Sequence, residues 1–153
     1  MRVIHPVILC LFIFVIASCK GKDKQSTTKS ENNIDAARNF IRAALDGKFD
    51  EARNFMLTDS LNTNYMDLAE RSFQNINQSI KDGYRAASIK ILNVMDVVKD
   101  SSTVVIYSNS FMNNPDTLKV LNVNGQWLVD FKYLYQHDSD TTINKPVSKD
   151  SLP

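Results

Sequence analysis

Few side chains of this 153-residue chain are suited to nucleophilic or metal chemistry. There are two cysteines, Cys10 and Cys19, and two histidines, His5 and His137. Of these groups, a cysteine thiolate is the strongest nucleophile, and it can form a thioether. Cys19 directly follows one aliphatic and two small residues at positions 16–18, so its thiol is the first candidate for covalent chemistry.

Residues 1–18 have the order of a secretory signal peptide. Arg2 precedes an apolar run at residues 7–16, and two small residues follow it. A membrane-spanning helix needs about 20 apolar residues, and this run ends before the polar residue Lys20. We therefore expect residues 1–18 to be removed, which leaves Cys19 as the only cysteine of the mature chain.

Ile16-Ala17-Ser18-Cys19 resembles the bacterial lipobox. The resemblance implies cleavage between Ser18 and Cys19, a diacylglycerol thioether on the sulfur, and an N-acyl chain such as palmitate on the new amino terminus. Each buried methylene adds about 0.8 kcal/mol, so several chains anchor the protein in a membrane. Lys20 replaces the Asp that retains many lipoproteins in the inner membrane, which favours the outer membrane of a Gram-negative bacterium. The alternative is a soluble secreted protein.

Metal and cofactor chemistry have little support. Loss of His5 leaves His137 alone beside Asp138 and Asp140, which excludes a multi-histidine centre. We interpret His137 as a solvated side chain and expect no metal. The 4 glycines of the chain form no phosphate-binding loop, so we expect no cofactor other than the lipid on Cys19.

The charge balance argues against nucleic acid as a partner. Removal of Arg2 leaves 17 of the 18 basic residues against 17 acidic ones. A nearly neutral domain has no electrostatic attraction to a phosphate backbone.

Composition divides the mature chain into three parts. Residues 19–33 form a lipidated tether, because positions 20–33 carry no large apolar residue, and its root-mean-square reach is about 20 Å. Residues 34–135 are long enough for one domain with its own core. Residues 136–153 are a polar tail, which we expect to be disordered.

Hydrophobic periodicity predicts three helices at the start of the domain. Apolar stripes with helical spacing run through residues 34–45, 49–56 and 65–76. Gly47 stands where a left-handed helix cap is favoured. Asp59 or Asn64 is the expected N-cap of the third helix.

After Asp82-Gly83 the hydrophobic period changes to two, which predicts strands. The expected strands are residues 88–98, 102–112, 117–123 and 126–135. The adjacent pair Ile91-Leu92 interrupts the alternation and indicates a bulge or a switch of faces. Asn124-Gly125 predicts a tight hairpin between the last two strands.

This order predicts an α+β fold, with N-terminal helices packed on a curved antiparallel sheet of about four strands. The chain resembles a family of small bacterial lipoproteins of unknown function in two segments, residues 37–52 (ARNFIRAALDGKFDEA) and 123–130 (VNGQWLVD). That family in turn resembles the nuclear transport factor 2-like superfamily. The resemblance implies a cone-shaped sheet with a pocket, and dimerisation through the sheet in relatives of this fold. These motifs indicate a fold, not a reaction.

Enzymes with this kind of cone, such as ketosteroid isomerases and dehydratases, place an acid or base with Tyr or His inside the pocket. Desolvation inside such a pocket raises the pKa of a carboxylate, which suits it to proton transfer. The candidates that the resemblance implies here are Asp130, Tyr107 and Tyr65. Asp130 shares its expected strand face with Lys132, so a solvent-facing ion pair is the favoured interpretation. Both tyrosines lie on apolar stripes, where a core role is favoured.

Four short segments resemble a periplasmic O-glycosylation pattern of Asp, then Ser or Thr, then an apolar residue or Thr. The acceptors are Ser60, Thr117, Thr141 and Ser151. Thr141 and Ser151 are favoured because they lie in the exposed tail. A helix cap explains Ser60 equally well, and a strand explains Thr117.

The function that we expect is non-enzymatic: a lipoprotein of the cell envelope whose domain binds a small apolar ligand or an envelope protein. The alternative is an enzyme that performs acid–base chemistry in its pocket, of the isomerase or dehydratase type. The absence of a catalytic histidine disfavours it. A homodimer is compatible with both.

Overall fold

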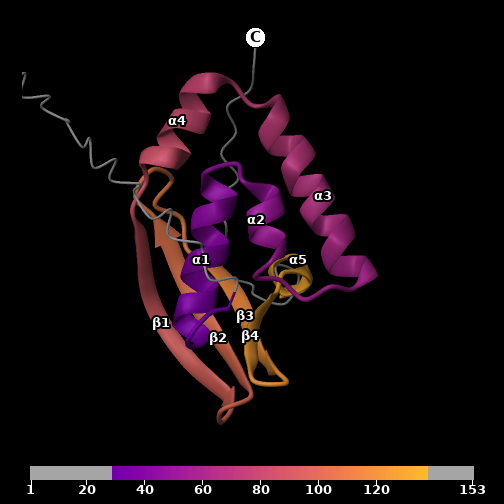
Figure 1. Ribbon diagram of the computed structural model, residues 1–153. Coiled ribbons are helices and arrows are strands. Elements are labelled where there is room, and N and C mark those ends of the chain that lie inside the picture. The colour runs from indigo at the N-terminus through magenta and orange to yellow at the C-terminus, as the bar shows by residue number, and fades with distance from the viewer. Residues whose placement is uncertain (1–28, 138–153) are drawn as a thin grey trace, which may run out of the picture.

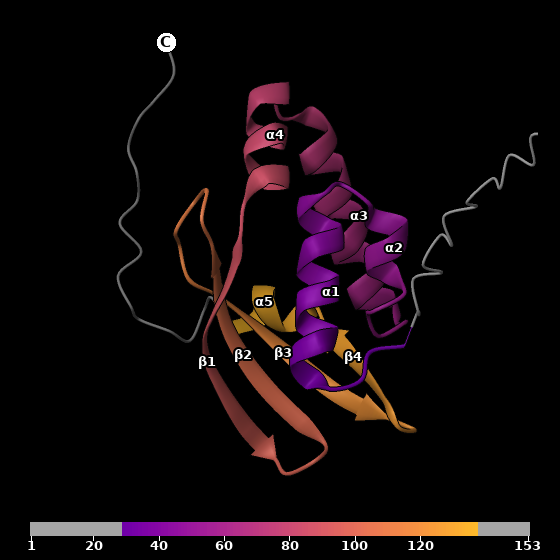
Figure 2. The same ribbon diagram turned by 60° about the vertical axis from the view of Figure 1, so that its left-hand side comes forward.

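The computed structural model describes residues 29–137 and confirms the α+β class (Figure 1). The elements are α1 (Asn33–Leu45), α2 (Phe49–Arg53), α3 (Ser60–Asn75), α4 (Gln78–Ala86), β1 (Ile89–Val98), β2 (Ser102–Asn109), β3 (Asp116–Val123), β4 (Gln126–Asp130) and α5 (Lys132–His137). The four strands form one antiparallel sheet in the order β1-β2-β3-β4. Figure 2 shows the sheet curving around α1.

Local sequence signals place most of these elements correctly. The register of β1 against β2 shifts between Ile91 and Asn93, which confirms the expected irregularity at Leu92. Asn124 and Gly125 both have positive φ, at 54° and 79°, as the hairpin turn requires. The side chain of Asp59 accepts a hydrogen bond from the Asn62 backbone N–H at 2.9 Å, so Asp59 caps α3.

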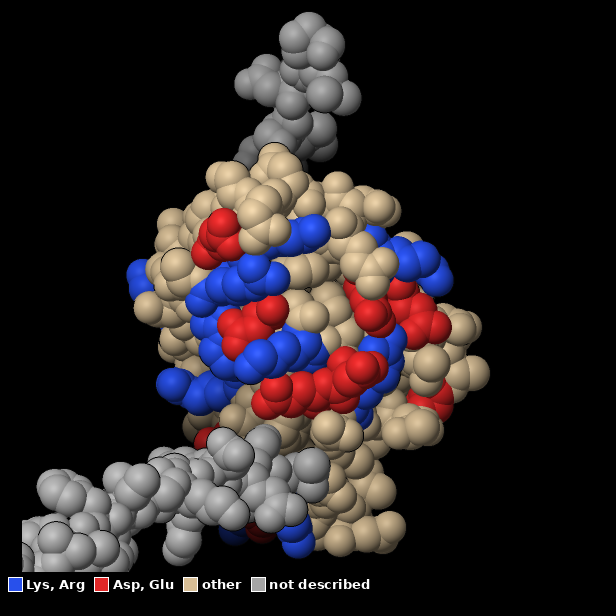
Figure 3. All heavy atoms as spheres, turned by 45° about the horizontal axis from the view of Figure 1, so that its top comes forward, with Lys and Arg blue, Asp and Glu red and all other residues tan. Residues whose placement is uncertain are grey.

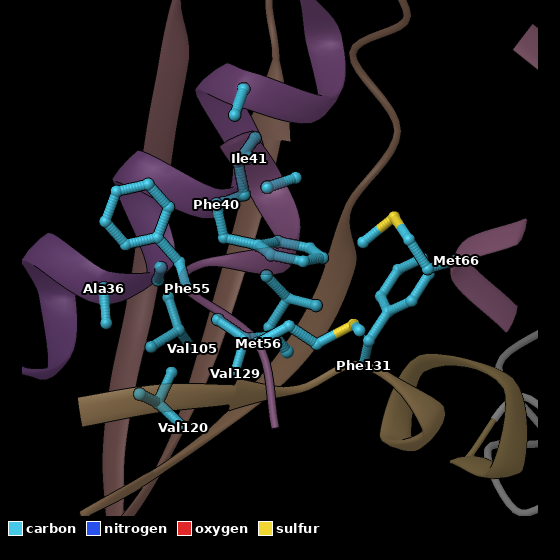
Figure 4. Close-up of a cluster of buried hydrophobic side chains, with 14 of the residues drawn as sticks. Ala36, Phe40, Ile41, Phe55, Met56, Met66, Val105, Val120, Val129 and Phe131 are labelled. Carbon is cyan, nitrogen blue, oxygen red and sulfur yellow. The ribbon is translucent and has the colours of Figure 1, made fainter. Parts of the chain in front are cut away.

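The main core lies between α1 and the concave face of the sheet (Figure 4). Phe40 and Ile41 of α1 are 2% and 3% exposed. They belong to the same buried cluster as Val105, Val120 and Val129, each of which is 0% exposed. Burying one such side chain contributes about 1.5–3 kcal/mol, so this layer is a large part of the stability of the domain.

The segment after α2 covers one edge of the sheet. The Val129 N–H donates to Phe55 O at 2.8 Å, and the Leu57 N–H donates to Val129 O at 2.9 Å. These bonds pair the segment with β4, whose outer edge carries backbone groups that need partners. The loop that leads into α3 is thereby held beside the end of β4, next to Asp130.

The expected strand over residues 126–135 is too long. β4 ends at Asp130, and α5 begins at Lys132. The backbone N–H of Lys132 donates to the Asn62 side-chain oxygen at 2.8 Å, which satisfies a donor at the start of this helix. Phe131 and Leu134, three positions apart, both reach the core, as helical spacing allows.

The sequence pattern also missed α4. The residues Asp82-Gly83, where the period was expected to change, lie inside this helix. Helix α4 buries none of its residues, so its apolar stripe is too short for a clear periodic signal. A Cβ at Gly83 would lie 2.4 Å from the Phe111 ring, so the absence of a side chain lets this ring pack against the helix.

The turn between α1 and α2 has the hydrogen bonds of a Schellman motif: the Lys48 N–H donates to Ala43 O, and the Gly47 N–H donates to Ala44 O. Gly47 adopts φ +76°, as its position at the end of the first apolar stripe predicts. A Cβ at this position would lie 2.5 Å from the Phe73 ring. The turn therefore needs glycine for its backbone conformation and for its contact with α3.

We expect Gly47→Ala to lower the free energy of unfolding by more than Gly125→Ala. Gly125 has a similar φ of +79° but no atom within 4 Å of an added Cβ. The left-handed backbone costs both variants about 1–2 kcal/mol. Only Gly47→Ala must also displace Phe73. Urea unfolding of both variants measures the difference, and equal losses would contradict the proposed role of the ring.

Candidate functional site

An apolar pocket of about 320 Å³ lies where the four N-terminal helices meet. Its walls are Ala44, Leu45, Phe49, Ala69, Ser72, Phe73, Ile76 and Tyr84. Small-molecule sites in proteins enclose about 300–1,000 Å³ and are mostly apolar. The pocket therefore has the size and lining of a site for a small ligand.

Helix spacing on α3 and the turn at Gly47 build the walls of this pocket. The α3 residues of the lining are positions 69, 72 and 73, which fall on one helical face, and Ile76 directly follows the end of the helix. The ring of Phe73 meets Phe49 edge to face, with centroids 5.5 Å apart, and lies 6.4 Å from the ring of Tyr84. Tyr84 in turn contacts Phe111 at 5.3 Å, which connects α4 to the loop after β2.

Charged side chains surround an uncharged hollow at this end of the molecule (Figure 3). Arg53 donates to Asp67 at 2.8 Å and to Glu70 at 2.7 Å. The hydrogen bond to Glu70 is the main cause that raises the pKa of Arg53. Such pairs hold α2 against α3 and present a polar rim to solvent.

The pocket walls contain little that can react. They include no Asp, Glu, Lys, Arg, His or Cys side chain. The hydroxyl of Ser72 donates to Leu68 O at 2.9 Å, within its own helix. Tyr84 supplies the only other side-chain hydroxyl of the lining. The arrangement suits the exclusion of water from an apolar ligand, not proton transfer.

Asp130 lies at the end of β4, outside this pocket. Its carboxylate forms the expected ion pair with Lys132, with Oδ1 2.6 Å from Nζ. The expected solvent-facing position is wrong, because Asp130 is only 8% exposed. Lys132 approaches from the start of α5 and also bonds Asp59 at 3.2 Å. The hydrogen bond to Asp130 is the main cause that raises the pKa of Lys132.

Sequence reasoning missed the residue that organises this polar cluster, Asn62. Its side chain is 0% exposed and donates to Asp59 at 2.7 Å and to Asp130 at 3.2 Å. Its oxygen accepts from the Lys132 backbone N–H. Its only local signal is its place three residues after the α3 cap, so nothing in the sequence indicated its distant partners.

The two candidate tyrosines, Tyr65 and Tyr107, both lie near Tyr135. Tyr65 stacks on Tyr135 with centroids 4.2 Å apart and an interplanar angle of 4°. Burial raises the pKa of Tyr107, and the charges of Asp116 and Tyr135 add to the shift. The hydrogen bonds of the Asp130 side chain go to Asn62 and Lys132, and none goes to a tyrosine. The structure therefore groups the tyrosines but does not join them to the carboxylate.

Several expected sites lie outside the described residues. These are Ser18 and Cys19 at the cleavage site, the acceptors Thr141 and Ser151, and the side chain of His137. Within residues 29–137, no three His, Cys, Asp or Glu side chains gather as metal ligands would. None of the helices in this range combines the length and the hydropathy needed to cross a membrane.

Comparisons with protein-family models, with curated proteins and with solved structures found no match to this chain.

We expect Asp59 to make the stability of the domain depend on pH in the acid range. The hydrogen bond from the Asn62 backbone N–H is the main cause that lowers the pKa of Asp59 from 3.8. A lowered pKa stabilises the folded state above about pH 4, and this stabilisation is lost as the pH falls through the folded-state value.

Asp59→Asn retains a capping side chain but removes the charge. Its free energy of unfolding should therefore fall less than that of the unchanged protein between pH 5 and pH 2. Asp50→Asn is the control, because the Asp50 side chain is fully exposed, at 104%, although it also pairs with an arginine. Urea unfolding at each pH gives the slopes. Identical slopes for Asp59→Asn and the unchanged protein would contradict the role of Asp59.

Proposed function

We propose that this chain is a lipid-anchored binding module of the cell envelope, which takes a small apolar ligand into the pocket between α1, α2, α3 and α4. The observation that carries the proposal is the lining of that pocket, which combines three aromatic rings with aliphatic side chains and no ionised group. A ligand that enters it exchanges contact with water for contact with these rings.

The lipobox-like residues 16–19 support the anchored state. In this proposal Cys19 carries the lipid, and residues 20–33 connect the anchor to α1. The outer membrane of a Gram-negative bacterium is the proposed location, on the strength of Lys20 after the cysteine. The ligand would then reach the domain from the aqueous side of that membrane.

The fold supports a non-enzymatic role in a nuclear transport factor 2-like domain. A curved antiparallel sheet with α1 in its concavity agrees with that superfamily, and its cone shape remains part of the proposal (Figure 2). The engagement of Asp130 by Lys132 and Asn62 favours binding over acid–base catalysis, because this carboxylate already has its partners. The alternative is that the domain binds an envelope protein or a second copy of this chain instead of a small ligand.

We expect Ala69→Phe to abolish ligand capture, because the larger side chain fills the pocket that Ala69 lines. Leu68→Phe is the control at the neighbouring position, where the side chain is 47% exposed. A decanol analogue that carries a photoreactive diazirine is the neutral probe. Mass spectrometry should find it cross-linked to α3 peptides in the unchanged protein and in Leu68→Phe only. Equal labelling of Ala69→Phe would contradict the pocket as the binding site.

We expect Cys19→Ala to leave the chain without lipid. Mass spectrometry of the variant should therefore find none of the diacylglyceryl and acyl mass that the unchanged protein carries. Ser26→Ala in the tether is a matched control, because it changes a small residue without removing a thiol. If Cys19→Ala still carries the mass of the diacylglyceryl and acyl groups, Cys19 is not the lipidated residue.

A further inference from the structure

Lys81 of α4 stands beside one wall of the apolar pocket, the ring of Phe73. Its ammonium lies 5.8 Å from the centroid of the Phe73 ring, which forms a wall of the pocket. Its hydrogen bond goes to a neutral group, the backbone oxygen of Gln74, at 2.9 Å. Among residues 29–137, the partners of this ammonium are therefore the ring and a backbone oxygen, and no carboxylate forms an ion pair with it.

Three other cations, on α1, on α4 and in the turn between α1 and α2, are paired with carboxylates. Arg42 bonds Asp46 at 2.8 Å. Arg85 bonds Asp82 at 3.3 Å. Lys48 lies 3.7 Å from Asp46. In the range 29–137, Lys81 forms no ion pair, although Asp82 is its neighbour in sequence.

From this geometry we infer that the ligand is an anionic amphiphile, such as a carboxylate with an acyl chain of medium length, whose head group binds Lys81 while its chain fills the pocket. The inference rests on the proposed function of the pocket and names the class of ligand. An ammonium at an apolar surface attracts a carboxylate strongly, because the local dielectric constant is lower than that of water.

The dimensions of the site agree with this class of ligand. The volume of about 320 Å³ is about twice that of a cavity that holds one benzene ring. The pocket therefore has room for one chain of medium length but not for a two-chain phospholipid. The polar group of an amphiphile must stay near the rim, because the walls offer only the hydroxyls of Ser72 and Tyr84.

The test compares two photoreactive probes of equal chain length, a diazirine-bearing decanoate and the corresponding decanol. The full lipidated protein is held in nanodiscs of phosphatidylethanolamine and phosphatidylglycerol, and cross-linked peptides are quantified by mass spectrometry. We expect the decanoate to label α3 and α4 peptides several-fold more than the decanol. Lys81→Gln should remove this preference without lowering the decanol labelling, and Lys81→Arg should restore it.

Lys99→Gln is the matched control, because Lys99 is an exposed lysine in the turn between β1 and β2. It should retain the preference for the decanoate. Equal labelling by the two probes would overturn the inference and leave the apolar pocket intact as a binding site. A preference that survives in Lys81→Gln would also overturn it. If neither probe labels the pocket, the proposed function itself fails, and the inference fails with it.

Discussion

The structure depends on the burial of one face of α1 against the curved sheet. Phe40 and Ile41 lie over the inward-facing valines of β2, β3 and β4, and this contact joins segments that are far apart in the sequence (Figure 4). With α1 on the concave face, α2 packs against α1 and α3 packs against α2, and the segment after α2 pairs with β4. The polar cluster around Asn62 then connects the start of α3 to the start of α5.

The apolar pocket is a consequence of the same arrangement. The C-terminal end of α1 meets residues of α2, α3 and α4 at the pocket, and the lining includes the small residues Ala44, Ala69 and Ser72. A protein core normally fills such space at the density of an organic crystal. Here the small side chains stand opposite the rings of Phe49 and Phe73, so space remains between the helices. The walls of the pocket come from helices, and Gly47 forms the left-handed turn between two of them.

Local chemistry predicted the parts of the fold that depend on neighbouring residues. The left-handed Gly47, the capping Asp59 and the Asn124-Gly125 hairpin each satisfy a backbone requirement within a few positions, so the sequence contains the whole signal. The end of β4 was different. Alternation from Trp127 through Tyr135 fits a strand, and the change to α5 depends on Asn62, which is 70 positions away in the chain. Helix α4 was missed because it buries no residue of its own.

The apolar pocket was the hardest feature to predict. The resemblance to a cone-shaped superfamily implied a site at Asp130, Tyr107 and Tyr65. The apolar pocket lies among the helices, and its lining includes none of these residues. Its walls come from four helices, and no motif marks them as functional.

Native mass spectrometry of the protein, purified from its own cells, tests the central claim most directly. The account predicts a non-covalent small molecule bound to each chain, which is released when the protein unfolds. A chain that carries only its covalent lipid, and gains no mass when envelope lipids are added back, would contradict it.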